Sequence, residues 1–180
     1  MLIDRDQSTL MVIDLQARLQ PSIHDGGAVL ANCIALLEAA QRLGVPCVIT
    51  EQYPSGLGGT VEAVKAVARD ARYVEKTHFS CVAEGCLGDT AVVARPQVVV
   101  CGTEAHVCVL QTVVELLEEG KAVFVVADAV GSRAPQNTRL ALERMRARGA
   151  RIVSREMVLF EWLRKADTDE FRAINRDFIR

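Results

Sequence analysis

Short apolar runs alternate with amphipathic stretches from one end of the chain to the other. The apolar runs are continuous, rich in valine, and predicted as strands at residues 9–15, 45–50, 73–75, 97–101, 122–127 and 150–153. A strand that is apolar at successive positions is covered on both faces, which is typical of parallel sheets. The pattern therefore predicts a buried parallel sheet.

The amphipathic stretches between these runs predict the helices. They lie at residues 28–43, 60–68, 107–119 and 135–148, and one or two short helices are expected within 156–179. Glycines at 44, 120 and 149 follow three of them, as expected for helix C-termini. The alternation predicts a three-layer α/β/α, Rossmann-like fold with a six-stranded, mostly parallel sheet. Because no linker or repeat interrupts it, residues 1–180 are expected to form a single domain.

Composition narrows the class of partner. The 180 residues are 50% hydrophobic and 24% charged, with a net charge of −2, so neither nucleic acid nor an anionic membrane is expected to bind. The first six residues lack the features of a signal peptide, and no apolar run approaches the roughly 18 residues of a membrane span. We expect a cytoplasmic protein that acts on a small molecule. The six cysteines lack CxxC or zinc-type spacing and are expected to be reduced thiols.

Polar residues gather where the predicted strands end. Ligands of an open parallel sheet bind outside the carboxyl ends of its strands. Asp14 and Asp128 close the first and fifth strands, Lys76 follows the third, and residues 102–108 follow the fourth. A carboxylate inside an apolar run requires a cationic partner, and Lys76 is the natural candidate for Asp14. The two residues form either a plain ion pair between strand ends or part of a site.

Cys108 favours the second interpretation. It follows the tight connection 102–107 (GTEAHV) and is expected in the first turn of a helix, where free N–H groups and the dipole favour thiolate. A nearby Asp–Lys pair can take and return its proton, and the same N–H groups can hold an oxyanion. The alternative for any single cysteine is a buried spectator, which suits Cys33, Cys47 and Cys101. Cys81 and Cys86, expected in an irregular loop, stay open.

The segments that carry these residues resemble a known family. Residues 12–16 (VIDLQ), 75–80 (EKTHFS) and 102–112 (GTEAHVCVLQT) resemble the isochorismatase-like cysteine hydrolase superfamily. Further segments at 50–54, 56–58, 127–133 and 156–160 resemble the branch of isochorismatase domain-containing proteins. The resemblance implies a triad of Asp14, Lys76 and Cys108. It also implies a cis peptide bond between Thr103 and Glu104, which aims the N–H groups of Glu104 and Cys108 at a substrate carbonyl.

The implied reaction is hydrolysis of a small amide-type substrate through a thioester on Cys108, without a cofactor. Nicotinamidases of the superfamily bind a metal through an Asp and two His after the second strand, but residues 49–72 contain no histidine, so no metal site is expected. True isochorismatases lack the cysteine, which argues against vinyl-ether hydrolysis. The alternatives are a non-catalytic metabolite-binding or scaffold member of the fold, and a flavodoxin-like module, whose phosphate loop or CxxC motif is absent.

Other positions have two interpretations each. Gln16, Tyr53, Leu57 and Phe79 are expected near the pocket mouth, where they either line a partly apolar site or pack. His106 is expected to point away from Cys108 rather than form a Cys–His dyad. Asp128 is expected to brace a loop with Ser132 and Arg133. The relatives imply a homo-oligomer, and the apolar run 157–163 with Trp162 is either part of an interface or buried within the monomer.

Overall fold

A single sheet of six parallel strands forms the centre of the molecule. The computed structural model describes residues 1–179. The strand order is β3-β2-β1-β4-β5-β6, and every pairing is parallel. The strands are β1 (Ser8–Ile13), β2 (Cys47–Gln52), β3 (Arg72–Lys76), β4 (Gln97–Thr103), β5 (Ala122–Gly131) and β6 (Arg151–Val153). The predicted sheet is confirmed, with no antiparallel member among its strands.

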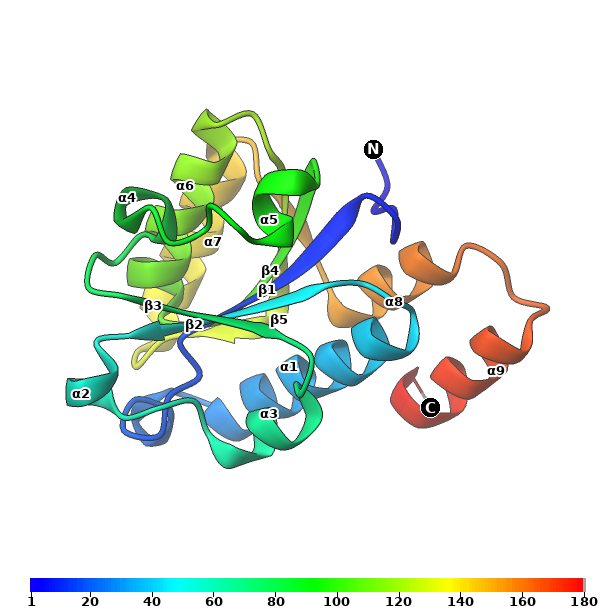
Figure 1. Cartoon of the computed structure of the whole chain (residues 1–180), viewed down its shortest axis with the longest axis horizontal. Helices are drawn as coiled ribbons and strands as arrows, with labels where there is room; N and C mark the ends of the chain where they lie inside the picture. Colours follow the sequence, from blue (N-terminus) through cyan, green and yellow to red (C-terminus); the bar gives the residue numbers. More distant parts are fainter. Residues whose placement is uncertain (180) are drawn as a thin grey trace.

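Helices cover both faces of the sheet (Figure 1). One layer contains α1 (Gly26–Arg42), α3 (Glu62–Val67), α8 (Arg155–Leu163) and α9 (Asp169–Ile174). The other contains α4 (Cys81–Glu84), α5 (Ala91–Ala94), α6 (Leu110–Glu118) and α7 (Pro135–Ala147). The predicted three-layer fold is therefore confirmed. None of the helices within residues 1–179 is long and apolar enough to cross a bilayer.

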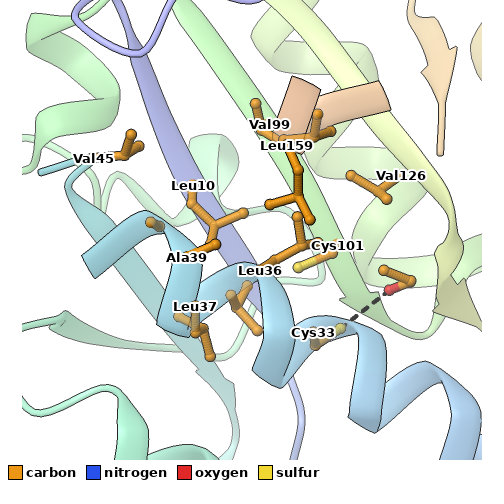
Figure 2. Close-up of a cluster of buried hydrophobic side chains, with 14 of the residues drawn as sticks. Leu10, Cys33, Leu36, Leu37, Ala39, Val45, Val99, Cys101, Val126 and Leu159 are labelled. Atoms are coloured by element: carbon orange, nitrogen blue, oxygen red, sulfur yellow. Dashed lines mark hydrogen bonds between the residues drawn. The ribbon is translucent and has the colours of Figure 1, made fainter. Parts of the chain in front are cut away.

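Two hydrophobic clusters fill the space between the layers. Because successive side chains of a strand point to opposite faces, Val99 and Cys101 of β4 enter one cluster, while Val98 and Val100 enter the other. Figure 2 shows the first cluster, where Leu36 and other side chains of α1 meet residues of β1 and β4. Burial on both sides explains the continuous apolar runs in the sequence.

The fifth strand is longer than predicted. The pairing of β4 with β5 shifts register between Val100 and Gly102, and pairing resumes at Gly102–Val130 and continues to Gly131. Asp128 therefore lies inside β5 and does not close it. Its Oδ1 accepts a hydrogen bond from the backbone N–H of Arg155 at the start of α8, 2.7 Å away. The expected grouping of Asp128 with Ser132 and Arg133 is wrong, because that shift carries the two later residues beyond the strand.

The C-terminal apolar run divides between two environments. Trp162 is buried, and its Nε1–H donates to Ser8 Oγ over 3.0 Å, so burial within the monomer accounts for it. Met157 and Phe160 remain exposed on α8. The segment predicted as an irregular loop around Cys81 contains the helical turn α4.

Candidate active site

Two adjacent strands approach each other closely at their carboxyl ends. Gly102 has a φ of +114°, and a Cβ atom there would lie 2.0 Å from the carbonyl oxygen of Ile13. Only glycine fits such a contact. One residue further on, Thr103 Oγ1 donates to the backbone oxygen of Asp14 over 2.8 Å. The end of β4 is thereby tied to the point where the chain leaves β1.

Asp14 and Lys76 form an ion pair at this edge of the sheet. Lys76 Nζ lies 2.8 Å from Asp14 Oδ2, and both side chains are completely buried. The other carboxylate oxygen, Oδ1, accepts a hydrogen bond of 2.6 Å from Thr50 Oγ1. A buried charge is tolerated when it is paired and its remaining lone pairs are satisfied, as they are here. The partner expected for Asp14 is therefore present.

Gln52, at the end of β2, is a contact that the sequence interpretation missed. Its Oε1 accepts from Lys76 Nζ over 2.6 Å and lies 3.8 Å from Cys108 Sγ, while its Nε2 donates to the Thr77 oxygen over 2.7 Å. Thr50 and Gln52 are two residues apart and so share one face of β2. Two polar residues on one face at the end of an otherwise apolar strand could have identified Gln52 as a site residue from the sequence.

Cys108 reaches the same centre from beyond the end of β4, which lies on the other side of β1 from β2 and β3. It lies in the first turn of a helical segment, as predicted, but this turn is a π-helix, η2 (Ala105–Val109), which leads directly into α6. The N–H of Val109 donates to the oxygen of Glu104, five residues back, over 3.2 Å. π-turns of this kind occur frequently at functional sites. The peptide bond between Thr103 and Glu104 is cis, and the Cys108 side chain is almost wholly buried.

Burial and charge determine the protonation states at the centre. Burial raises the pKa of the Cys108 thiol to about 12; the Asp14 carboxylate adds to the rise, and Lys76 opposes it. Burial by itself would lower the pKa of Lys76, but the charge of Asp14 and its hydrogen bond raise the pKa above its ordinary value. Both shifts favour the protonated forms, a neutral Cys108 thiol and a Lys76 cation. The expectation that the helix terminus favours thiolate is wrong, because desolvation outweighs it.

The four predicted pocket residues have different surroundings. Gln16 is buried; its Nε2 donates to the oxygens of Gln52 and Gly58, and its Oε1 accepts from the Gln52 N–H, which favours the packing interpretation. Tyr53 is exposed and lines a pocket of about 420 Å³ that also includes residues 75–77 and Glu84. Leu57, in α2 (Pro54–Leu57), is half-buried, and Phe79 is exposed. Neither lines that pocket.

His106 points away from Cys108, into a network that braces the π-turn. Its Nδ1 lies 2.9 Å from Ser132 Oγ and 3.2 Å from Glu104 Oε2. Arg133 Nε pairs with Glu104 Oε1 at 2.5 Å. Ser132 and Arg133 therefore brace Glu104 and His106 in place of the expected Asp128. Within the described residues, 1–179, no three His, Cys, Asp or Glu side chains are arranged to hold a metal ion.

Known proteins share both the sequence and this fold. The isochorismatase domain family model matches residues 8–157. The chain is 36% identical over 170 residues to isochorismatase domain-containing protein 2 of Danio rerio, covering 94% of this chain and 85% of that protein.

Two solved structures are also similar. One is the MAR1 ribonuclease of Caenorhabditis elegans, with a TM-score of 0.94 and 33% identity over 100% of this chain and 93% of that one. The other is the YcaC gene product of Escherichia coli, described as an octameric hydrolase of unknown specificity, with a TM-score of 0.91 and 25% identity over 99% and 91% of the two chains. From its sequence and its hydrolase fold, the chain belongs to the isochorismatase domain family.

Proposed function

We propose that this protein is a cysteine-dependent hydrolase that cleaves the C–N bond of a small amide-type substrate through a thioester on Cys108. The observation that carries the proposal is the buried Asp14–Lys76 pair, 2.8 Å long, at the same centre as the Cys108 thiol. A nucleophile, a proton acceptor and a fixed positive charge within one desolvated space meet the requirements of covalent catalysis. Membership of a hydrolase family supports the same reaction class.

Asp14 is proposed as the group that moves the proton. Because the pKa of Cys108 is raised to about 12, the thiol is neutral before substrate arrives and needs a base in the transition state. The Asp14 carboxylate takes the thiol proton as sulfur attacks the carbonyl carbon. Asp14 then returns it to the leaving amine. Lys76 holds the carboxylate in place and compensates its charge throughout.

The π-turn is proposed to stabilise the tetrahedral intermediate. The backbone N–H groups of Glu104 and Cys108 are the proposed oxyanion donors, and Glu104 is held by Arg133 and lies close to His106. Preorganised donors of this kind are worth about 3 kcal/mol or more in the transition state. Water then hydrolyses the thioester and frees Cys108.

The proposal extends to the partners of the chain. The substrate is a small molecule, and RNA is not expected despite the name of the Caenorhabditis elegans relative, because the net charge of −2 offers no electrostatic attraction for phosphates. The octameric YcaC protein supports assembly of this chain into a homo-oligomer. Activity inside the cytoplasm is part of the same hypothesis.

A substrate screen with a matched cysteine control tests the proposal. Small amides, carbamates, ureas and an RNA oligonucleotide are incubated with the wild-type protein, Cys108→Ala and Cys47→Ala. The pKa of the Cys47 thiol is likewise raised to about 12 by burial, but Cys47 lies at the start of β2, the opposite end of the sheet from Asp14 and Lys76. We expect Cys47→Ala to retain turnover and Cys108→Ala to lose at least about a thousandfold.

Mass spectrometry of the intact protein provides the second readout. An acyl adduct on Cys108 is expected to accumulate with a slowly deacylating substrate. Turnover by Cys108→Ala at the wild-type rate would refute the nucleophile assignment. Binding of a metabolite without turnover by any variant would favour the non-catalytic alternative.

A further inference from the structure

A tight turn at the end of α4 brings two thiols together beside the active site. Cys81 begins α4, and Cys86 follows Gly85, whose φ of +70° is left-handed. The N–H of Gly85 donates to the oxygen of Val82 over 2.9 Å, which is the inner bond of a Schellman motif. In that motif the side chains of the residue three before the C-cap and the second residue after it are frequently in contact. Those two positions are Cys81 and Cys86.

The two sulfur atoms are free, and the turn holds them in contact. Both cysteines are unpaired thiols, and Cys86 Sγ lies 3.5 Å from the carbonyl oxygen of Cys81. The two thiols are also close enough for each to shift the pKa of the other. A disulfide needs Cα atoms about 4.4–6.8 Å apart, and the left-handed turn at Gly85 brings Cys86 back toward Cys81.

The two thiols differ in access and in acidity. Cys81 is fully buried, whereas Cys86 is half-buried and so can be reached by a small oxidant. The neighbouring Cys81 thiol lowers the pKa of Cys86 below its ordinary value, although burial opposes the shift. The neighbouring Cys86 thiol and burial both raise the pKa of Cys81. Since oxidants attack the more accessible, more acidic thiol, Cys86 is the sulfur that reacts first.

We propose that Cys81 and Cys86 are a redox-sensitive pair that a peroxide converts into an intramolecular disulfide. The Cys86 sulfur attacks the O–O bond of the peroxide, loses two electrons and becomes a sulfenic acid, while the peroxide leaves as an alcohol or water. The Cys81 thiol then displaces that oxygen, forming the S–S bond and releasing water that carries the thiol proton. The proposal does not depend on the hydrolase reaction.

The position of the pair links it to the active-site edge. Glu84 Oε2 accepts from the N–H groups of Thr77 and His78, at 3.0 and 2.7 Å, so α4 is bound to the residues that directly follow Lys76. The Cys81 thiol is also close enough to Lys76 and Asp14 for their charges to affect its pKa, which Lys76 lowers and Asp14 raises. Oxidation therefore modifies the chain next to the catalytic lysine.

A second pair of thiols in the same chain is a matched control. Cys33 on α1 and Cys101 on β4 belong to the same core cluster, and Cys33 is close enough to raise the pKa of Cys101. Both are fully buried in the core, where Figure 2 shows them among leucine and valine side chains. Cys33 donates to the oxygen of Ala129 at 3.2 Å. The two thiols are near each other, but an oxidant in solution cannot reach either of them, so this pair is expected to stay reduced.

Peptide mapping of peroxide-treated protein tests the proposal. The Cys108→Ala variant is used because it lacks the proposed nucleophile as a competing thiol. The folded protein is exposed to submillimolar hydrogen peroxide. It is then unfolded in denaturant that contains an alkylating reagent, which blocks the remaining free thiols, and digested at acidic residues. Cleavage after Glu84 and before Asp89 places Cys81 and Cys86 in separate peptides, which stay joined only by a disulfide. We expect the joined peptides, an intact mass of one chain less two hydrogens, and full reversal by dithiothreitol.

The variant Cys86→Ser, in the same background, is expected to leave Cys81 reduced under identical treatment. Three results would overturn the proposal. The first is Cys86 accumulating as sulfinic acid while Cys81 remains open to alkylation, and the second is both thiols persisting in folded protein. The third is oxidation of Cys33 and Cys101 at the same rate, because contact and not access would then govern the chemistry.

Discussion

At the scale of single residues, the site is defined by one carboxylate that is buried away from the molecular surface. Asp14 is fully buried, and each of its carboxylate oxygens has a partner, Lys76 on one side and Thr50 on the other. Removing one partner of such a pair typically costs about 3–5 kcal/mol, which is a large share of the stability of a domain. Apolar residues of similar size would stabilise the fold equally well, so stability alone does not explain a buried ion pair at this position. Its location beside a thiol favours a chemical role.

The pKa of Cys108 gives a pH-dependent prediction. Because the folded pKa is raised to about 12, the thiolate fraction, and with it the rate of alkylation of Cys108 by iodoacetamide, is expected to rise about tenfold per unit between about pH 7 and pH 9. Asp14→Asn removes one cause of the rise, so alkylation is expected to become faster while hydrolysis is lost. The rate is followed by mass spectrometry of the native protein.

A pH-independent alkylation rate across this range would show a thiolate in the free protein and contradict the assignment.

The raised pKa of Cys108 also affects the stability of the fold. A raised folded pKa means that the native state holds its proton longer than the unfolded chain. The stabilisation is therefore complete below the ordinary thiol pKa of 9.0 and is lost as pH rises toward about 12.

At the scale of secondary-structure elements, the junction between β1 and β4 has the least freedom. The register pairs Ile13 with Gly102, and the backbones are so close there that no side chain fits on the glycine. The contact determines where Asp14 leaves the sheet and where the π-turn begins. The close contact at this glycine thus ties Asp14 to the segment that leads to Cys108.

Gly102→Ala is expected to destabilise the fold by about 3 kcal/mol, because the new Cβ collides with the Ile13 backbone and φ is left-handed. Gly120→Ala is the matched control, since Gly120 also has a positive φ, +82°, but nothing lies within 4 Å of its Cβ position. That control is expected to cost about 1 kcal/mol. Urea unfolding measures both, and equal losses would refute the role of the close approach.

At the scale of the whole molecule, the surface leaves two large apolar side chains of α8 exposed. Trp162 of the same helix is buried against β1, so α8 has one face in the core and Met157 and Phe160 outside. Exposed apolar side chains occur singly on many monomers and by themselves identify no interface. The octameric relative makes assembly the hypothesis to test.

Size-exclusion chromatography with light scattering is expected to give a mass that is a multiple of one chain at micromolar concentration. The measurement is repeated at high salt. An assembly held by apolar burial is expected to persist there, because salt screens only charge interactions. A mass of one chain under both conditions would contradict the proposed homo-oligomer.

The order of apolar and polar residues was sufficient to predict the sheet, the two helical layers and the pairing of Asp14 with Lys76. Strands that are buried on both faces are rich in valine, so they can be recognised in the sequence. An aspartate in such an apolar run is stable only beside a cationic partner, so a lysine at a neighbouring strand end is expected to pair with it. The resemblance to a family added the cysteine's role. These features are local, or follow from one rule about strand ends.

Only the tertiary structure decided the rest. Gln52 joins the centre because β2 lies between β1 and β3, a strand order that no local pattern specifies. Asp14 and Lys76 are 62 positions apart in the chain, and their distance depends on that order. The neutral state of Cys108 follows from burial by segments distant in sequence, and desolvation is a property of the packed molecule. The sequence alone could therefore identify Cys108 as a candidate site residue, but the packing of the folded chain determined the pKa of its thiol.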